Sequence, residues 1–396
     1  PQRDERLGWT GDAAIFSKTA SYTFDTRKFY KKWIHDIAAD QDESGMIPHV
    51  IPNVLTNVDL ESAGAPDDGG FKPTSACGWA DCITMIPWNV YRTYGDVSIL
   101  EDAFPVMQKY IDYIPTISKE AYLWTGTFQY GDWLGLDAEP GSYKGKSNDD
   151  FVASAFYAYT VSLFIKAGKV LKKDMSAYEA LYRKIVETFR KRFPVYETQT
   201  EHVLALQFGL TEDKEKTAAE LAALIRKDGG MKTGFLGTPF LLHALSDNGY
   251  TGLAYDLLLK KDYPSWLYPV TKGATTIWEH WDGIMPDGSF WSPDMNSFNH
   301  YAYGSVCDWI YEKACGIQLC EDAPGFDKVT ITPQPDDRLE YMEASIETLR
   351  GTVSSRWEKE DGRIRYTIEV PVEAEAVIDG NTCTLQPGRH VLYGKG

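Results

Sequence analysis

Acidic side chains stand beside tryptophan at several separated places in the sequence. Trp278 and Trp281 flank Glu279, and Trp9 stands between Glu5 and Asp12. Such pairs suit sugar binding, because an indole ring stacks on C–H faces while carboxylates bind hydroxyl groups. Two carboxyl groups can also hydrolyse a glycosidic bond, one as the acid and the other as the base or nucleophile. The segments that show this pattern are 3–12, 79–81, 130–134 and 275–283.

The same residues also allow purely structural interpretations. The charged segment 3–12 could be a solvated stretch of chain, although Trp9 and two glycines inside it argue against this. Glu279 could be a polar residue that caps a buried pair of Trp side chains. His300 stands beside Asn and Tyr at the start of a predicted helix, where it could satisfy a backbone group or bind a ligand hydroxyl. The residues by themselves leave these alternatives open.

The sequence lacks the motifs of several other enzyme classes. The sequence contains no P-loop, GxGxxG, GxSxG, HExxH or EF-hand pattern. None of the six cysteines forms a CxxC pair, so we expect buried thiols and predict no metal site and no cofactor. The formal net charge of -17 repels phosphate backbones and anionic lipids, so we expect neither nucleic-acid nor membrane partners.

Helical periodicity dominates the sequence up to about residue 315. Residues 28–38 place Phe29, Trp33, Ile34 and Ile37 on one predicted face, and residues 151–170 are almost wholly apolar or small. Many helices with short connections predict stacked helical hairpins. Closing six hairpins into a ring leaves no free edge, whereas an open solenoid would need a fixed repeat that the sequence lacks.

The hydrophobic period changes to two near residue 322. Val353, Ser355 and Trp357 alternate before a predicted turn at 360–362, and alternation resumes after it. We therefore predict a mainly α protein with a helical domain at 1–321 and an antiparallel β-sandwich at 322–396. Two long segments, 41–74 and 129–150, interrupt the helical pattern and are expected to form a functional rim.

Six short motifs, taken in their order, carry a resemblance to a known family. The sequence resembles the bacterial α-L-rhamnosidases of glycoside hydrolase family 78 over essentially its whole length. The motifs are RDERLGWTGDA at 3–13, GMIPHVIP at 45–52, GDWL at 131–134, TGFLGTPFLL at 233–242, TTIWEHWD at 275–282 and SFNHYAYG at 297–304.

The resemblance implies a fold, a reaction and a set of site residues. It implies an (α/α)6 barrel followed by a β-sandwich, and hydrolysis of terminal α-L-rhamnose with inversion. Glu5 would be the general acid and Glu279 the general base. The substrate-binding residues that it implies are Arg3, Trp9, Asp12, Trp79, Asp132, Trp133, Trp281 and His300.

The resemblance also bears on partners and on the competing functions. The expected partner is a rhamnose-containing glycoside or oligosaccharide. Upstream β-domains are expected in the same polypeptide. The sequence leaves the compartment open between the bacterial cytoplasm and the periplasm. The alternatives are another (α/α)6 glycosidase with a different sugar specificity, and a sugar-binding module without catalysis.

Overall fold

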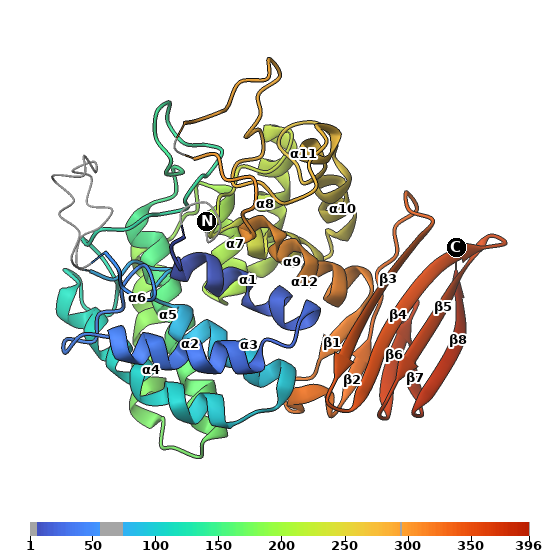
Figure 1. Ribbon diagram of the computed structural model, residues 1–396, viewed down its shortest axis with the longest axis horizontal. Helices are drawn as coiled ribbons and strands as arrows, with labels where there is room; N and C mark the ends of the chain where they lie inside the picture. Colours follow the sequence, from blue (N-terminus) through green and yellow to red (C-terminus); the bar gives the residue numbers. More distant parts are fainter. Residues whose placement is uncertain (1–5, 56–73, 294, 396) are drawn as a thin grey trace.

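The helices of the first domain form two concentric layers in the computed structural model, which describes residues 6–55, 74–293 and 295–395 (Figure 1). The inner helices contact one another in sequence order, and the last of them contacts the first. The inner layer consists of α1 (Thr10–Thr23), α3 (Cys82–Tyr94), α5 (Asp149–Val170), α7 (Gln199–Gln207), α9 (Thr238–Ser246), η1 (Ala302–Ser305) and α12 (Val306–Trp309). The outer layer contains α2 (Arg27–Asp40), α4 (Ser98–Ile117), α6 (Ser176–Arg192), α8 (Lys214–Asp228), α10 (Thr251–Leu259) and α11 (Leu267–Thr271). This closed ring confirms the predicted (α/α)6 barrel.

The apolar pattern of each helix explains its layer. The inner helix α5 is apolar on nearly every side and is long and apolar enough to cross a membrane, but 83% of its most apolar stretch is buried inside the ring. In the outer helix α6 only Ile185 and Phe189 are buried. In α2, Trp33, Ile34 and Ile37 are buried as predicted, whereas Phe29 is exposed and the prediction for it was wrong.

Polar contacts between the first and last inner helices close the ring. Lys18 Nζ of α1 lies 2.7 Å from Glu312 Oε2 of η2 (Ile310–Ala314), and the Tyr22 hydroxyl donates to Glu312 Oε1 at 2.6 Å. The Thr19 hydroxyl donates to the Ser305 carbonyl at 3.1 Å. Burial disfavours the charged form of Glu312, but Lys18, His243 and the Tyr22 hydroxyl together more than offset this and hold the pKa of Glu312 below its ordinary value.

The C-terminal domain is a sandwich of two four-stranded sheets. One sheet has the order β1-β2-β6-β7 and the other β3-β4-β5-β8, and every pairing is antiparallel except β2 with β6. The strands are β1 (Ile317–Leu319), β2 (Val329–Ile331), β3 (Tyr341–Thr348), β4 (Gly351–Glu360), β5 (Arg363–Val370), β6 (Ala374–Ile378), β7 (Asn381–Leu385) and β8 (Gly388–Lys395), and η3 (Pro324–Phe326) lies between β1 and β2.

The predicted alternation in this domain matches the observed burial. Val353, Ser355 and Trp357 of β4 all face the core. The β4–β5 turn follows from Asp361 and Gly362, whose φ angles of 50° and 74° are those of a type I′ hairpin. The predicted domain boundary at residue 322 falls after β1, which already pairs with β2.

The sandwich packs directly on the helical ring. Trp357 Nε1 donates to the Ala314 carbonyl at 2.9 Å, and Tyr22 of α1 belongs to the sandwich core. The Tyr255 hydroxyl of α10 donates to the Gln334 carbonyl at 2.7 Å. All six cysteines are free thiols, of which Cys77, Cys82 and Cys315 are buried and the others half-buried.

Candidate active site

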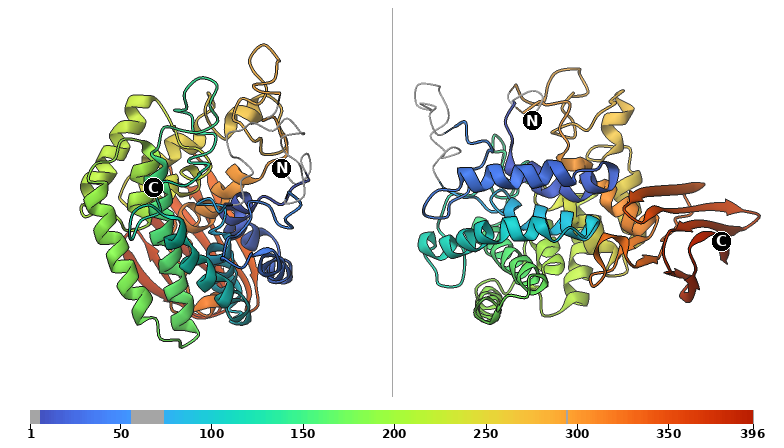
Figure 2. Two further views of the ribbon diagram at one scale, coloured as in Figure 1. Left: turned by 90° about the vertical axis from the view of Figure 1, so that its left-hand side faces the viewer. Right: turned by 60° about the horizontal axis from the view of Figure 1, so that its bottom comes forward.

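The long connecting loops gather at one end of the helical ring. The loops that precede α5 and η1 rise from the same end in Figure 1 and in the left-hand view of Figure 2. The predicted rim segment 129–150 lies here, while residues 56–73 of the other rim segment lie outside the described residues. This end therefore carries the segments in which sequence motifs predicted chemistry.

The first motif is built into the start of α1. Trp9 precedes the helix and forms a β-bridge with Val50, and Asp12 lies in the first helical turn with only 4% of its surface exposed. A carboxylate at this position is favoured by the partial positive charge of the helix N-terminus. Gly11 is required because a Cβ at this position would come within 2.7 Å of the Trp79 indole ring. The catalytic and binding roles predicted for Glu5 and Arg3 fall outside the described residues.

His300 joins Asp12 to Glu279. Its Nε2 lies 3.1 Å from Asp12 Oδ1 and 3.7 Å from Glu279 Oε1, and all three side chains are buried. Burial lowers the pKa of His300 well below its ordinary value, so the ring is neutral. The Ala302 backbone N–H approaches Nδ1 at 3.4 Å, which assigns the ring proton to Nε2 on the side of the two carboxylates. The three residues thus form one polar cluster.

Backbone pairing fixes the orientation of Glu279. Its N–H donates to the Ser297 carbonyl at 2.9 Å, and the Ser297 N–H donates to Glu279 Oε2 at 3.0 Å. The His300 N–H donates to the Ile277 carbonyl at 2.9 Å, so the two motifs around Glu279 and His300 run side by side. One carboxylate oxygen is therefore held by the backbone, and the other faces His300.

The two Trp side chains beside Glu279 anchor its segment in the core. Trp278 packs edge-to-face on Phe298 at a centroid distance of 5.1 Å. Trp281 stacks on Tyr303 at 4.1 Å and is 2% exposed. These rings anchor the chain on both sides of Glu279, and Trp281 is buried in the core.

Tyr130 is the centre of an aromatic cluster at the same end of the ring. Trp79 lies 4.5 Å from it, and Trp9 and Trp133 meet it edge-on at 6.2 and 5.8 Å. Trp9 and Trp133 are half-buried, whereas Trp79 is fully buried. Sequence reasoning gave the three Trp residues a binding role, whereas Tyr130 fell within the segment 130–134 without a role of its own.

The buried Asp132 carboxylate accepts hydrogen bonds from the backbone of a second motif, TGFLGTPFLL. Its Oδ1 accepts the N–H groups of Leu236 and Gly237 at 2.8 and 3.1 Å, and its Oδ2 accepts the N–H of Gly234 at 2.7 Å and the Thr200 hydroxyl. Burial raises the pKa of Asp132, while these hydrogen bonds favour its charged form. Asp132 therefore positions the 233–237 segment, from which Phe235 packs on His300 at 5.0 Å.

We expect Asp132→Asn to lower the free energy of unfolding by about 3 kcal/mol, because hydrogen bonds to a charged acceptor contribute about 1.5–3 kcal/mol each. An amide turns one accepting oxygen into a donor that faces a backbone N–H in either orientation. Urea denaturation followed by circular dichroism measures the loss. Asp327→Asn, at a half-exposed position beside Arg350, is the control and should change stability little. Unchanged stability of Asp132→Asn with a raised KM would instead assign Asp132 to sugar binding, as the sequence predicted.

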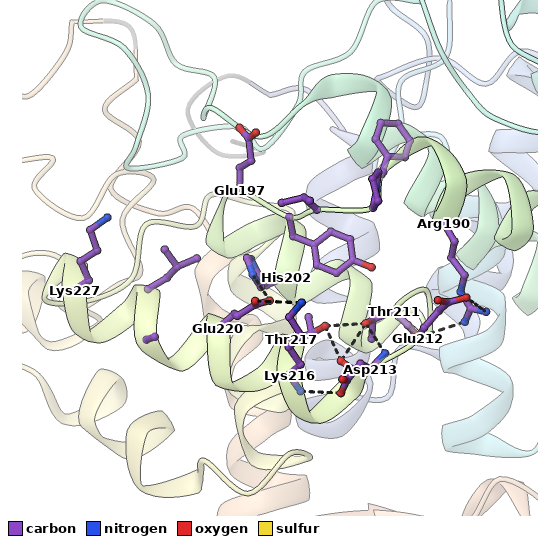
Figure 3. Close-up of a pocket in the computed structure, with 16 residues that line it drawn as sticks. Arg190, Glu197, His202, Thr211, Glu212, Asp213, Lys216, Thr217, Glu220 and Lys227 are labelled. Atoms are coloured by element: carbon purple, nitrogen blue, oxygen red, sulfur yellow. Dashed lines mark hydrogen bonds and ion pairs between the residues drawn. The ribbon is translucent and has the colours of Figure 1, made fainter.

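A separate hollow lies on the outside of the ring between α6, α7 and α8 (Figure 3). It measures about 590 Å³ and is lined by Tyr196, His202 and Glu220, among others. None of the predicted site residues that the structure describes lines it. The cluster of Asp12, Glu279 and His300 is therefore distinct from this groove.

Comparison with known proteins matches both domains to one family. Residues 1–314 match the model of the bacterial α-L-rhamnosidase six-hairpin glycosidase domain, and residues 316–385 match that of the bacterial α-L-rhamnosidase C-terminal domain. An α-L-rhamnosidase of Streptomyces avermitilis is 37% identical over 96% of this chain, and one of Formosa agariphila is 36% identical over 96%. The chain spans only 35% and 40% of the length of these two relatives.

Solved structures show the same likeness. The S. avermitilis α-L-rhamnosidase complexed with L-rhamnose superposes with a TM-score of 0.87 at 34% identity, covering 98% of this chain and 38% of that one. The α-L-rhamnosidase of Aspergillus terreus superposes with a TM-score of 0.89 at 31% identity, covering 100% of this chain and 46% of that one. With both domains matched in sequence and in fold, the chain belongs to the α-L-rhamnosidases of glycoside hydrolase family 78.

Proposed function

We propose that this chain carries the catalytic domain of an exo-acting α-L-rhamnosidase that works with inversion. The observation that carries the proposal is the buried cluster in which Glu279 is fixed by Ser297 and lies 3.7 Å from His300. Membership of the family supports the reaction class. The S. avermitilis relative binds the monosaccharide L-rhamnose, which supports recognition of a single terminal sugar.

The proposed reaction needs one base and one acid. Glu279 removes a proton from a water molecule while the water oxygen bonds to the anomeric carbon. The bond from that carbon to the leaving oxygen breaks, and the leaving oxygen takes a proton from Glu5. The anomeric configuration inverts because water attacks the face opposite to the leaving group.

The remaining site residues would bind the sugar. Asp12 and His300 offer an acceptor and a donor for its hydroxyl groups. Trp9 and Trp133 are half-buried and could present a ring to the C–H faces and the methyl group of rhamnose. In this proposal Arg3 adds a cationic donor, while Trp79 and Trp281 support the site from the core.

We expect the chain to hydrolyse 4-nitrophenyl α-L-rhamnoside and to release β-L-rhamnose first. Proton NMR of the anomeric signals, recorded before mutarotation, measures this. First release of the α-anomer would exclude Glu279 as the general base of a single displacement. Hydrolysis of a glucoside or glucuronide but not of the rhamnoside would favour a different sugar specificity. Calorimetric binding of L-rhamnose without any turnover would favour a sugar-binding module.

A further inference from the structure

Two buried polar atoms in the motifs around Glu279 and His300 have no hydrogen-bond partner in the part of the chain that the structure describes. They are Nε1 of Trp281 and the hydroxyl oxygen of Tyr303. The side chains are 2% and 1% exposed. Leaving a buried donor unpaired costs stability, and a Phe at either position would avoid that cost. What sets these two donors apart from other unpaired donors, such as that of Tyr157, is that they belong to the two paired motifs that hold Glu279 and His300.

The rings that carry these atoms are fixed by their neighbours. Trp281 stacks on Tyr303 with an interplanar angle of 20°, and Trp266 meets Trp281 edge-on at 5.2 Å. Trp266 Nε1 also donates to the Tyr303 carbonyl at 2.9 Å, which fixes the backbone under the stack. Neither ring can turn its polar atom toward another protein group without breaking this packing.

The Tyr303 hydroxyl lies close to the proposed catalytic cluster. Phe235 contacts the rings of both Tyr303 and His300 at 5.0 Å. Burial raises the pKa of Tyr303 well above its ordinary value, and the nearby charges of Asp132 and Glu279 add to this effect. The hydroxyl is thus a neutral donor in the field of two carboxylates.

The oxygens of Asp132 already accept hydrogen bonds from Thr200 and from three backbone N–H groups. Glu279 is the other carboxylate whose charge acts on the Tyr303 hydroxyl, so we take it as the target of the two donors. A direct hydrogen bond between Tyr303 and Glu279 is not formed, so a bridging group is needed. Water suits this role, because a buried water makes about three hydrogen bonds.

We propose that Tyr303 and Trp281 together hold a buried water that donates a hydrogen bond to Glu279. The inference rests on the proposed function of Glu279 as the general base. Tyr303 acts through this water and is a positioning residue. Because the water donates to the charged carboxylate, it favours the ionised base and keeps the carboxylate aimed at the sugar.

The other titratable groups around this cluster come from separate elements. His300 lies between Glu279 and Asp12 of α1, and Asp132 and Tyr263 face the Tyr303 hydroxyl. Burial also raises the pKa of Tyr263, so this group is neutral at ordinary pH. Replacing Tyr303 by Phe leaves all these groups in place and removes one oxygen atom.

We expect Tyr303→Phe to lower kcat on 4-nitrophenyl α-L-rhamnoside about 10-fold or more and to move the acid limb of kcat/KM to higher pH by about half a unit or more. KM should change less than kcat, because the hydroxyl does not touch the sugar. Trp281→Phe should likewise lower kcat and move the acid limb of kcat/KM to higher pH. The acid limb moves to higher pH because losing a donor disfavours the ionised form of Glu279, so a higher pH is needed to ionise it.

Tyr157→Phe is the matched control. Tyr157 of α5 also has a buried hydroxyl without a partner among the described residues, but it faces Asp112 and Tyr178 on the outside of the ring. Its replacement should leave the pH profile unchanged and should not lower Tm. Trp124→Phe is the corresponding control for Trp281, because Trp124 Nε1 is likewise buried without a partner.

If Tyr303→Phe behaves like Tyr157→Phe in kcat, pH profile and Tm, the hydroxyl is merely unpaired and the inference fails. A crystal structure of the unsubstituted chain gives a second test that does not depend on turnover. It should show a water within hydrogen-bond distance of Tyr303, Trp281 and Glu279, and its absence at high resolution would also overturn the inference. Failure of the proposed function is distinct, because a chain that hydrolyses no rhamnoside could still hold this water.

Discussion

Replacing Glu279 by Gln should lower kcat on 4-nitrophenyl α-L-rhamnoside by about 10³-fold, within the range that a general base contributes. The amide cannot take a proton from water. The Ser297 N–H must still face an oxygen, so the amide nitrogen of the variant will occupy the position of Oε1, on the side of His300. The substitution therefore removes the basic atom while keeping the shape and the backbone contact.

Three measurements separate loss of the base from loss of the fold. Tm should stay close to that of the unsubstituted chain, and calorimetry should still detect L-rhamnose binding. Glu340→Gln, at a side chain that is 84% exposed, is the matched control and should keep full activity. Azide should partly restore turnover in Glu279→Ala, because an anionic nucleophile needs no base. A kcat near that of the unsubstituted chain in Glu279→Gln would remove Glu279 from its proposed role.

Replacing Glu5 by Gln should have an effect that depends on the leaving group. We expect about a 10³-fold loss of kcat/KM on methyl α-L-rhamnoside, whose leaving oxygen needs protonation, because general acid catalysis contributes about 10²–10⁴-fold. The loss on 2,4-dinitrophenyl α-L-rhamnoside should be far smaller, because that phenolate leaves without a proton. Steady-state kinetics on the two substrates measures the contrast.

The same two substrates distinguish the acid from the base. Glu279→Gln should slow both by similar factors, because attack by water is needed for each. Equal losses on both substrates in Glu5→Gln would contradict its role as the acid. For an inverting enzyme the two carboxyl groups should stand about 6.5–9.5 Å apart, leaving room for the water.

The chain's local patterns determined much of the fold. The nearly all-apolar segment 151–170 could only be stable as a helix buried on most sides, and α5 is the inner helix that it predicts. The alternation through Val353, Ser355 and Trp357 predicted which faces of β4 are buried. Such patterns succeed because they report the side chain's own burial, which depends on the local period of the backbone.

The exceptions have local physical causes too. A proline inside a helix usually kinks or breaks it, yet α3 continues through the buried Pro87. Phe29 matches the apolar period of α2 but lies outside the contact with the ring, where Tyr30 is buried instead. Tertiary packing overrides a local preference when enough apolar surface is buried around it.

The sequence by itself predicted the kinds of residue in the site, and only the tertiary structure decided which of them meet. Asp12, Glu279 and His300 come from opposite ends of the helical domain and converge because the first and last inner helices close the ring. The GDWL motif could not show that the Asp132 oxygens accept backbone N–H groups of residues 234–237, because those groups come from a distant part of the chain. Local spacing specifies a residue's neighbours along the chain, whereas the partners that set its charge and orientation come from distant segments.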